Sequence, residues 1–122
     1  PDVELYTMTE NLTVVRNICG AVSIPVIADT DTGYGNAINI MRTVREFENA
    51  GVSGMIFEDQ LSPKKCAACA NRIELLGVEE AVGKIRAAVE ARQNPDTIII
   101  ARTDEVDEDA AGRQGQRAEA GS

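Results

Sequence analysis

Histidine and tryptophan are absent from this 122-residue sequence, and aromatic residues make up only 3% of it. A zinc site needs about four ligands, mostly histidine or cysteine, and a chain with three cysteines and no histidine argues against one. The scarcity of aromatic residues predicts a core built from aliphatic side chains, for which a hydrophobic content of 43% is sufficient.

Further absences bear on compartment and partners. No apolar run approaches the ~20 residues of a membrane span. The sequence does not open with a basic segment followed by an apolar one, so nothing suggests a signal peptide. Twelve basic residues stand against twenty acidic ones, and the net charge of -8 argues against nucleic acid or an anionic membrane as a partner. An odd number of cysteines without a secretory signal predicts a reducing, cytoplasmic location without disulfides.

Three apolar segments end in charged side chains. Residues 25–29 end in Asp29, with Asp31 just beyond it; residues 54–59 end in Glu58 and Asp59; residues 97–104 end in an arginine and an acid. Segments that are apolar throughout are typical of parallel strands covered on both faces. The carboxyl ends of such strands meet at one face of an α/β barrel, where metals and substrates are held.

Helical spacing is expected between these strands. The predicted helices span residues 9–21, 36–50 and 78–92, and the predicted strands span residues 26–29, 53–59 and 97–101. Thr9 is the predicted cap of the first helix, Gly51 closes the second, and the third has an apolar face of Val78, Val82, Ile85 and Val89. Strand–helix alternation predicts parallel β/α units in one domain over residues 1–122, with a poorly defined tail at 107–122.

The acids have two interpretations from the pattern alone. Asp29, Asp31 and Glu58 are either ligands of a divalent cation, which prefers oxygen, or solvated residues and helix caps. The segment 33–35, GYG, lacks the third glycine of a dinucleotide fingerprint and the lysine of a P-loop. It therefore predicts a tight turn that lets the backbone approach the metal site.

Two cysteines lie in a long segment between strand and helix, residues 60–77. Cys66 and Cys69 form a CxxC pattern with three interpretations: a zinc site, a redox dithiol or chance. A redox dithiol usually lies at the start of a helix that directly follows a strand, whereas these cysteines lie within a long loop. Chance is therefore favoured for Cys69. Lys64 and Lys65 favour the thiolate of Cys66.

Five segments in order resemble one known family. The sequence resembles the isocitrate lyase and phosphoenolpyruvate mutase superfamily, most of all its 2-methylisocitrate lyase and 2,3-dimethylmalate lyase branch. The segments are residues 28–36 (ADTDTGYGN), 42–44 (RTV), 58–60 (EDQ), 63–66 (PKKC) and 101–104 (ARTD). The resemblance implies a (β/α)8 barrel, which typically takes about 250 residues. We therefore expect a partial barrel, truncated at both ends, and a homo-oligomer related to the family's tetramers.

The resemblance also implies a site. Mg²⁺, with Mn²⁺ as a substitute, would be bound directly by Asp29, and Asp31, Glu58 and Asp2 would hold its water molecules. Cys66 would be the acid/base thiol on the loop.

On the substrate side, Arg102 would lie against the oxygens of a small carboxylate. Tyr34 and Gly35 would contact the same substrate. Asp104 is expected to be a structural partner of Arg102 rather than a catalyst.

The implied reaction is cleavage of a carbon–carbon bond in a small 2-hydroxy di- or tricarboxylate, giving an α-oxo acid and a second carboxylate. The sequence departs from the branch at Cys66, because Ala67 and Ala68 replace the usual Gly-His. Two alternatives stay open: phosphoenolpyruvate or phosphonate mutase chemistry, whose branch usually carries Asn-Ser rather than cysteine in this loop, and a non-catalytic fragment of the family.

Overall fold

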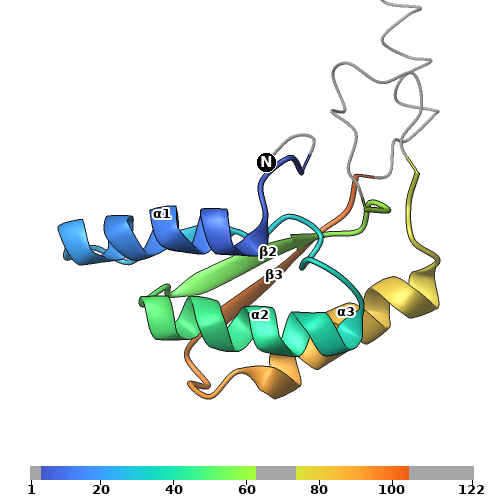
Figure 1. Cartoon of the computed structure of the whole chain (residues 1–122). Helices are drawn as coiled ribbons and strands as arrows, with labels where there is room; N and C mark the ends of the chain where they lie inside the picture. Colours follow the sequence, from blue (N-terminus) through green and yellow to red (C-terminus); the bar gives the residue numbers. More distant parts are fainter. Residues whose placement is uncertain (1–3, 63–73, 105–122) are drawn as a thin grey trace, which may run out of the picture.

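The computed structural model describes residues 4–62 and 74–104, which form a three-stranded parallel sheet with helices packed on it (Figure 1). The elements alternate along the chain, as predicted, and every strand is found within one residue of its predicted bounds. Their order is α1 (Met8–Ala21), β1 (Ile27–Asp29), α2 (Ala37–Ala50), β2 (Gly54–Glu58), α3 (Val78–Ala91) and β3 (Ile98–Arg102).

The register of the sheet decides which side chains share a face. Ile27 pairs with Gly54 and Gly54 with Ile98, while Glu58 pairs with Arg102. Because side chains alternate along a strand, Ala28, Met55 and Phe57 point to one face, where they join the helices in the core. The strand-end residues Asp29, Glu58 and Arg102 belong to the opposite face.

Helix ends follow local capping chemistry. α2 begins after Asn36, whose side chain accepts from the backbone N–H of Ile38 and of Asn39, and it ends at Gly51 with φ of 105°, as predicted. The predicted cap of α1 at Thr9 is wrong. Thr7 caps α1 instead, because Glu10 stands three residues on and completes a capping box with it.

The predicted apolar face of α3 is largely not its buried face. Val78 is 79% exposed and Val82 49% exposed, whereas Lys84, Ala88 and Ala91 are buried. The reason is the placement of the helix: α3 packs chiefly against α2 and touches β3 only lightly. The small side chains of Ala88 and Ala91 allow that close helix–helix approach.

Burial of the strands differs from the expectation as well. β2 is covered on both faces, but β3 is largely exposed, with Ile98 at 54%. The expected aliphatic core is present, and both phenylalanines lie at its centre, Phe47 at 0% and Phe57 at 2% exposure. Within residues 4–62 and 74–104, each helix has 14 residues and none is long and apolar enough to cross a membrane.

Candidate metal centre

The residues just after β1 continue to pair with β2, and this pairing brings Asp31 and Glu58 close together. The Thr30 N–H donates to the Ile56 carbonyl at 3.0 Å, and the Glu58 N–H donates to the Asp31 carbonyl at 2.9 Å. These bonds hold Asp31, which follows β1, directly beside the end of β2. The carboxyl ends of two parallel strands thus converge, as the sequence predicted.

The turn that follows is tight, as its glycines predicted. Asp31, Gly33 and Tyr34 all have positive φ, at 54°, 93° and 63°. A side chain at Gly33 would lie 2.4 Å from Ile40 Cγ1, so only glycine fits there. Thr43 of α2 donates through Oγ1 to the Gly33 carbonyl at 2.9 Å and fastens the turn to the helix.

Three carboxylates gather at this edge of the sheet. Asp29, Asp31 and Glu58 each offer one oxygen, and these oxygens lie within 4.8 Å of one another. Asp31 is 0% and Glu58 6% exposed, and the Asp31 N–H donates to Asp29 Oδ1 at 2.9 Å. An all-oxygen donor set of clustered, buried carboxylates fits a hard divalent cation such as Mg²⁺ or Mn²⁺.

Arg102 supplies a positive charge next to these acids. Its Nη1 lies 3.8 Å from Glu58 Oε1, and its Nη2 lies 3.0 Å from Asp104 Oδ1. Asp104 and then Glu58 raise the pKa of the guanidinium, which therefore stays charged. About half of the side chain is exposed, so the charge remains accessible to a ligand. Asp104 is the structural partner of Arg102 that the sequence predicted.

Gln60 joins the two acids that flank Arg102. Its Nε2 donates to Asp104 Oδ2 at 2.8 Å and to Glu58 Oε2 at 3.4 Å. Burial on its own would raise the pKa of Asp104, but the hydrogen bond from Gln60 and the interactions with Glu58 and Arg102 together lower it. Sequence reasoning missed Gln60, because a glutamine after a strand carries no signal of its tertiary partners.

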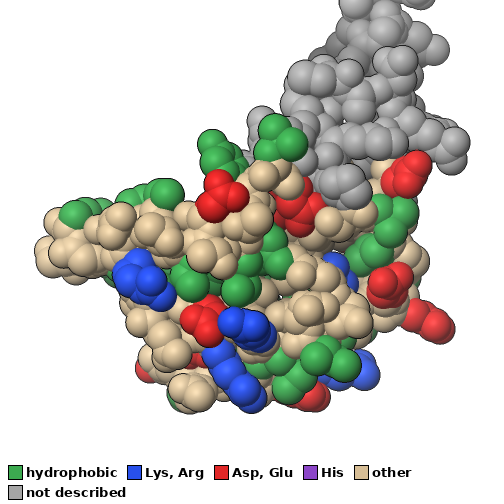
Figure 2. All heavy atoms as spheres, viewed as in Figure 1, with side chains coloured by type: hydrophobic (Ala, Val, Ile, Leu, Met, Phe, Trp, Pro, Cys, Tyr) green, Lys and Arg blue, Asp and Glu red, His purple; other side chains and the backbone are tan. Residues whose placement is uncertain are grey.

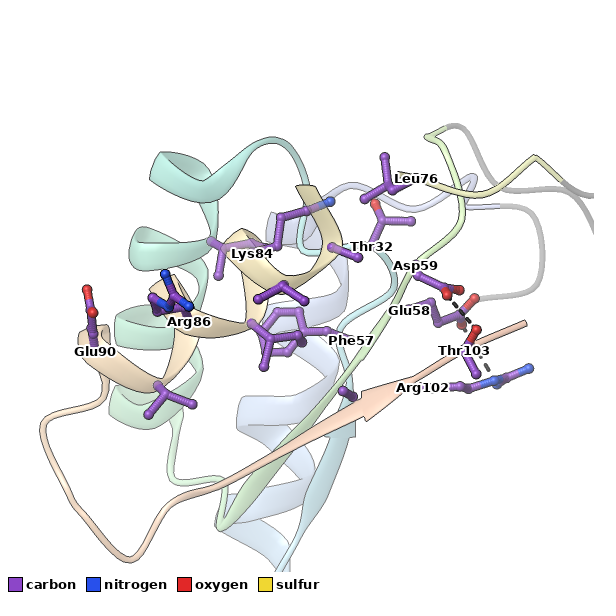
Figure 3. Close-up of a pocket in the computed structure, with 16 residues that line it drawn as sticks. Thr32, Phe57, Glu58, Asp59, Leu76, Lys84, Arg86, Glu90, Arg102 and Thr103 are labelled. Atoms are coloured by element: carbon purple, nitrogen blue, oxygen red, sulfur yellow. Dashed lines mark hydrogen bonds and ion pairs between the residues drawn. The ribbon is translucent and has the colours of Figure 1, made fainter. Parts of the chain in front are cut away.

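A groove of about 700 Å³ begins at this cluster and runs between α3 and β3. Figure 3 shows Glu58 and Arg102 at one end, with Phe57 and Lys84 further along and Glu90 at the far end. Its remaining walls are mainly apolar, and they include Val82, Ile85 and Val89 of α3. Glu58 and Arg102 are therefore next to an open space, which Asp29 and Asp31 do not line.

The other predicted site residues have different places. Asp2 and Cys66 lie outside the described residues, as does Cys69. Tyr34 and Gly35 form the turn after Asp31, and Tyr34 directs its hydroxyl to Asp31 Oδ2 at 3.1 Å. Asn11 of α1 also reaches the site, a contact that no motif in the sequence indicated.

Comparisons with known proteins agree with this arrangement. The family model described as phosphoenolpyruvate phosphomutase matches residues 1–120. The 2,3-dimethylmalate lyase of Eubacterium barkeri is 57% identical over 104 residues, covering 85% of this chain and 36% of the lyase. The chain thus spans about a third of the length of that relative.

Two solved structures extend the comparison. Phosphoenolpyruvate phosphomutase from Streptomyces platensis subsp. rosaceus superposes with a TM-score of 0.83 at 43% identity, over 98% of this chain and 43% of that one. Phosphonopyruvate hydrolase in complex with oxalate and Mg²⁺ gives a TM-score of 0.78 at 40% identity, over 98% of this chain and 42% of that one. The predicted superfamily and its fold are confirmed, and the three β/α units match part of that fold. The chain belongs to the phosphoenolpyruvate phosphomutase family, in the superfamily that also contains isocitrate lyase.

Proposed function

We propose that this chain contributes the metal-binding and substrate-facing side of a Mg²⁺-dependent carbon–carbon lyase acting on a small 2-hydroxy di- or tricarboxylate. The observation that carries the proposal is the approach of three carboxylate oxygens to within 4.8 Å at the ends of adjacent strands. The 57% identity to a 2,3-dimethylmalate lyase favours lyase chemistry. A cytoplasmic location remains a prediction.

The residues have distinct proposed roles at the metal. Asp29 is the proposed direct ligand, and Asp31, Glu58 and Asp2 are proposed to hold water molecules around the ion. When bound, the divalent ion would supply positive charge to the oxygens of the α-oxo acid. Buried carboxylates that face one another repel, so a cation between them also relieves a cost of folding.

The proposed reaction is a retro-aldol cleavage. A base removes the proton of the substrate hydroxyl, and the bond to the neighbouring carbon breaks, leaving the α-oxo product and a carbanion-like fragment. The fixed charge of Arg102 favours negative charge developing on the substrate oxygens. Cys66 is the proposed donor of the proton to the second fragment, and Tyr34 and Gly35 are proposed to contact the substrate through the turn.

Phosphonate chemistry is the second candidate. Its support is the superposition on a phosphoenolpyruvate phosphomutase and a phosphonopyruvate hydrolase. Phosphorus NMR of phosphonopyruvate incubated with the chain and Mg²⁺ distinguishes it from the lyase, because only phosphonate chemistry changes the phosphorus signal.

The metal site is tested first by direct titration. We expect the purified chain to bind Mn²⁺, followed by calorimetry, and Asp29→Asn to weaken binding at least about tenfold, since a direct charged ligand is lost. Asparagine keeps the Oδ1 that accepts from the Asp31 N–H, so the turn is preserved. Asp96→Asn, in an exposed turn, is the matched control and should leave binding unchanged.

Activity is then assayed as release of an α-oxo acid from 2,3-dimethylmalate, 2-methylisocitrate and isocitrate, with and without Mg²⁺. Release that depends on Mg²⁺ and is lost in Asp29→Asn supports the lyase. A folded chain that binds Mn²⁺, converts none of the three substrates and leaves the phosphorus signal of phosphonopyruvate unchanged supports the non-catalytic alternative instead.

A further inference from the structure

A second set of side chains connects α1 to the carboxylate cluster. Asn11 lies on α1, 18 residues before Asp29, and its Nδ2 donates to the Asp29 backbone carbonyl at 2.8 Å. The same Nδ2 lies 2.8 Å from Tyr34 Oη. Tyr34 Oη in turn lies 3.1 Å from Asp31 Oδ2. These contacts form a continuous path from a helix on the outside of the sheet to a carboxylate of the candidate metal centre.

Hydrogen-bond chemistry fixes the direction of this path. The Asp29 carbonyl only accepts, so the amide nitrogen of Asn11, not its oxygen, must face it. That nitrogen has two protons and no lone pair to offer, so Tyr34 Oη accepts from it. The Tyr34 hydroxyl proton is then directed to Asp31 Oδ2, and a hydrogen bond to one carboxylate oxygen restricts the orientation of that carboxylate.

The backbone at two residues of the path, Asp31 and Tyr34, is in a conformation that needs such support. Asp31 and Tyr34 are non-glycine residues with φ of 54° and 63°, a region that costs free energy for ordinary side chains. Burial, together with the neighbouring charge of Asp31, raises the pKa of the Tyr34 phenol above its ordinary value, so the hydroxyl keeps its proton at neutral pH.

We propose that Tyr34, held by Asn11, is a positioning residue that fixes the orientation of the Asp31 carboxylate for divalent cation binding. The inference rests on the proposed metal site and adds to it two residues that touch no metal. It also assigns the Tyr34 side chain a task separate from substrate contact, which the backbone of the turn remains able to make. Helix α1 thereby influences the affinity of a site that it does not line.

The test uses the whole chain and Mn²⁺ as the probe. Tyr34→Phe removes the hydroxyl and keeps the ring, and we expect the dissociation constant for Mn²⁺ to rise about tenfold, the effect of one hydrogen bond to a charged group. Tyr6→Phe is the matched control, because Tyr6 is 56% exposed and belongs to no part of the path. It should bind Mn²⁺ as the unmodified chain does.

Asn11→Ala separates this role from a purely structural one. If Asn11 acts through Tyr34, Asn11→Ala alone should raise the Mn²⁺ dissociation constant about threefold. In a chain that already carries Tyr34→Phe, Asn11→Ala should not change that constant further. Urea unfolding without metal supplies the second readout. If the hydroxyl only stabilises the fold, its removal in Tyr34→Phe would lower the midpoint of unfolding and leave the dissociation constant of the folded protein unchanged.

The outcomes distinguish this inference from the proposed function. If the unmodified chain binds Mn²⁺ and Tyr34→Phe binds it within twofold of that affinity, the positioning role is wrong and the metal site stands. If the effects of the two substitutions add, Asn11 does not act through Tyr34, and the path is refuted. If the unmodified chain binds no Mn²⁺, the metal site and the inference fail together.

Discussion

A lysine is among the buried polar residues of the fold. Lys84 is 7% exposed, and in Figure 3 its side chain extends from α3 toward Thr32 and Leu76. Burial lowers the pKa of its amine, and the charges of Glu80 and Glu4 only partly offset this effect. The folded state therefore holds this proton less tightly than the unfolded chain does.

The consequence is a pH-dependent cost. The pKa of Lys84 in the folded state lies below 10.5, its ordinary value. At a pH between these two values the unfolded chain binds more protons than the folded one, so the free energy of unfolding rises with pH there. We expect Lys84→Met to stabilise the protein by about 1 kcal/mol at pH 7. The gain should shrink as the pH approaches about 10.5, measured by urea unfolding at both pH values.

Arg86→Met is the matched control, since Arg86 is an exposed cation on the same helix. It should leave the free energy of unfolding within about 0.5 kcal/mol of the unmodified value. A gain of equal size in both variants, or a Lys84→Met gain that does not change with pH, contradicts the burial argument.

Some residues of the candidate site could be predicted from the sequence and others could not. Asp29, Glu58 and Arg102 were predictable as neighbours because each ends an apolar strand, and parallel strands bring their carboxyl ends together. Asn11 and Gln60 were not predictable, because their roles depend on partners 18 to 44 residues away in sequence. A polar side chain on a helix or after a strand is usually solvated, so its type alone indicates nothing.

At the scale of elements, capping residues in the sequence predicted the end of α2 but not the cap of α1, and the spacing of apolar residues did not predict which face of α3 is buried. Gly51 was predicted correctly to close α2, whereas Asn36, predicted as the first residue of that helix, is its N-terminal cap. The apolar face of α3 did not indicate its most buried side, because small residues on another face allow α3 to approach α2. Which face is buried depends on the neighbours, and periodicity alone does not reveal them.

Two glycines should respond oppositely to alanine. In the turn between β1 and α2, Gly33 has φ of 93°, and an added Cβ would meet Ile40 Cγ1 at 2.4 Å. Gly33→Ala should therefore destabilise the chain by about 2 kcal/mol or more. Gly83, inside α3, has nothing within 4 Å of an added Cβ, so Gly83→Ala should stabilise it by about 0.5–1 kcal/mol through helix propensity.

Thermal or urea unfolding of the two variants measures this contrast directly. Each substitution adds one methyl group to the same protein, so each serves as the control for the other. Equal signs for the two changes would show that the turn after β1 is not held in its left-handed conformation.

At the scale of the whole molecule, apolar side chains remain exposed on several surfaces of the described residues, and two of these surfaces bear on association. One is the sheet face on which Ile27 and Ile98, 51% and 54% exposed, flank Gly54. The other is a stripe formed by Val14 and Ile18 of α1 and by Val22 just after the helix. Figure 2 shows hydrophobic side chains along one edge of α1. Among the described residues, β1 and β3 are also the edges of the sheet. Such surfaces favour association.

We expect the chain to self-associate through the sheet face, because there exposed isoleucines lie next to an unpaired strand edge, whereas the stripe on α1 has no backbone groups to pair. Ile98→Lys should shift sedimentation velocity profiles toward the monomer at concentrations where the unmodified chain is associated. Val14→Lys places the same charge on α1 and should leave the profile unchanged. The opposite pattern would assign the interface to α1, and a chain that stays monomeric at every concentration would contradict the expected homo-oligomer.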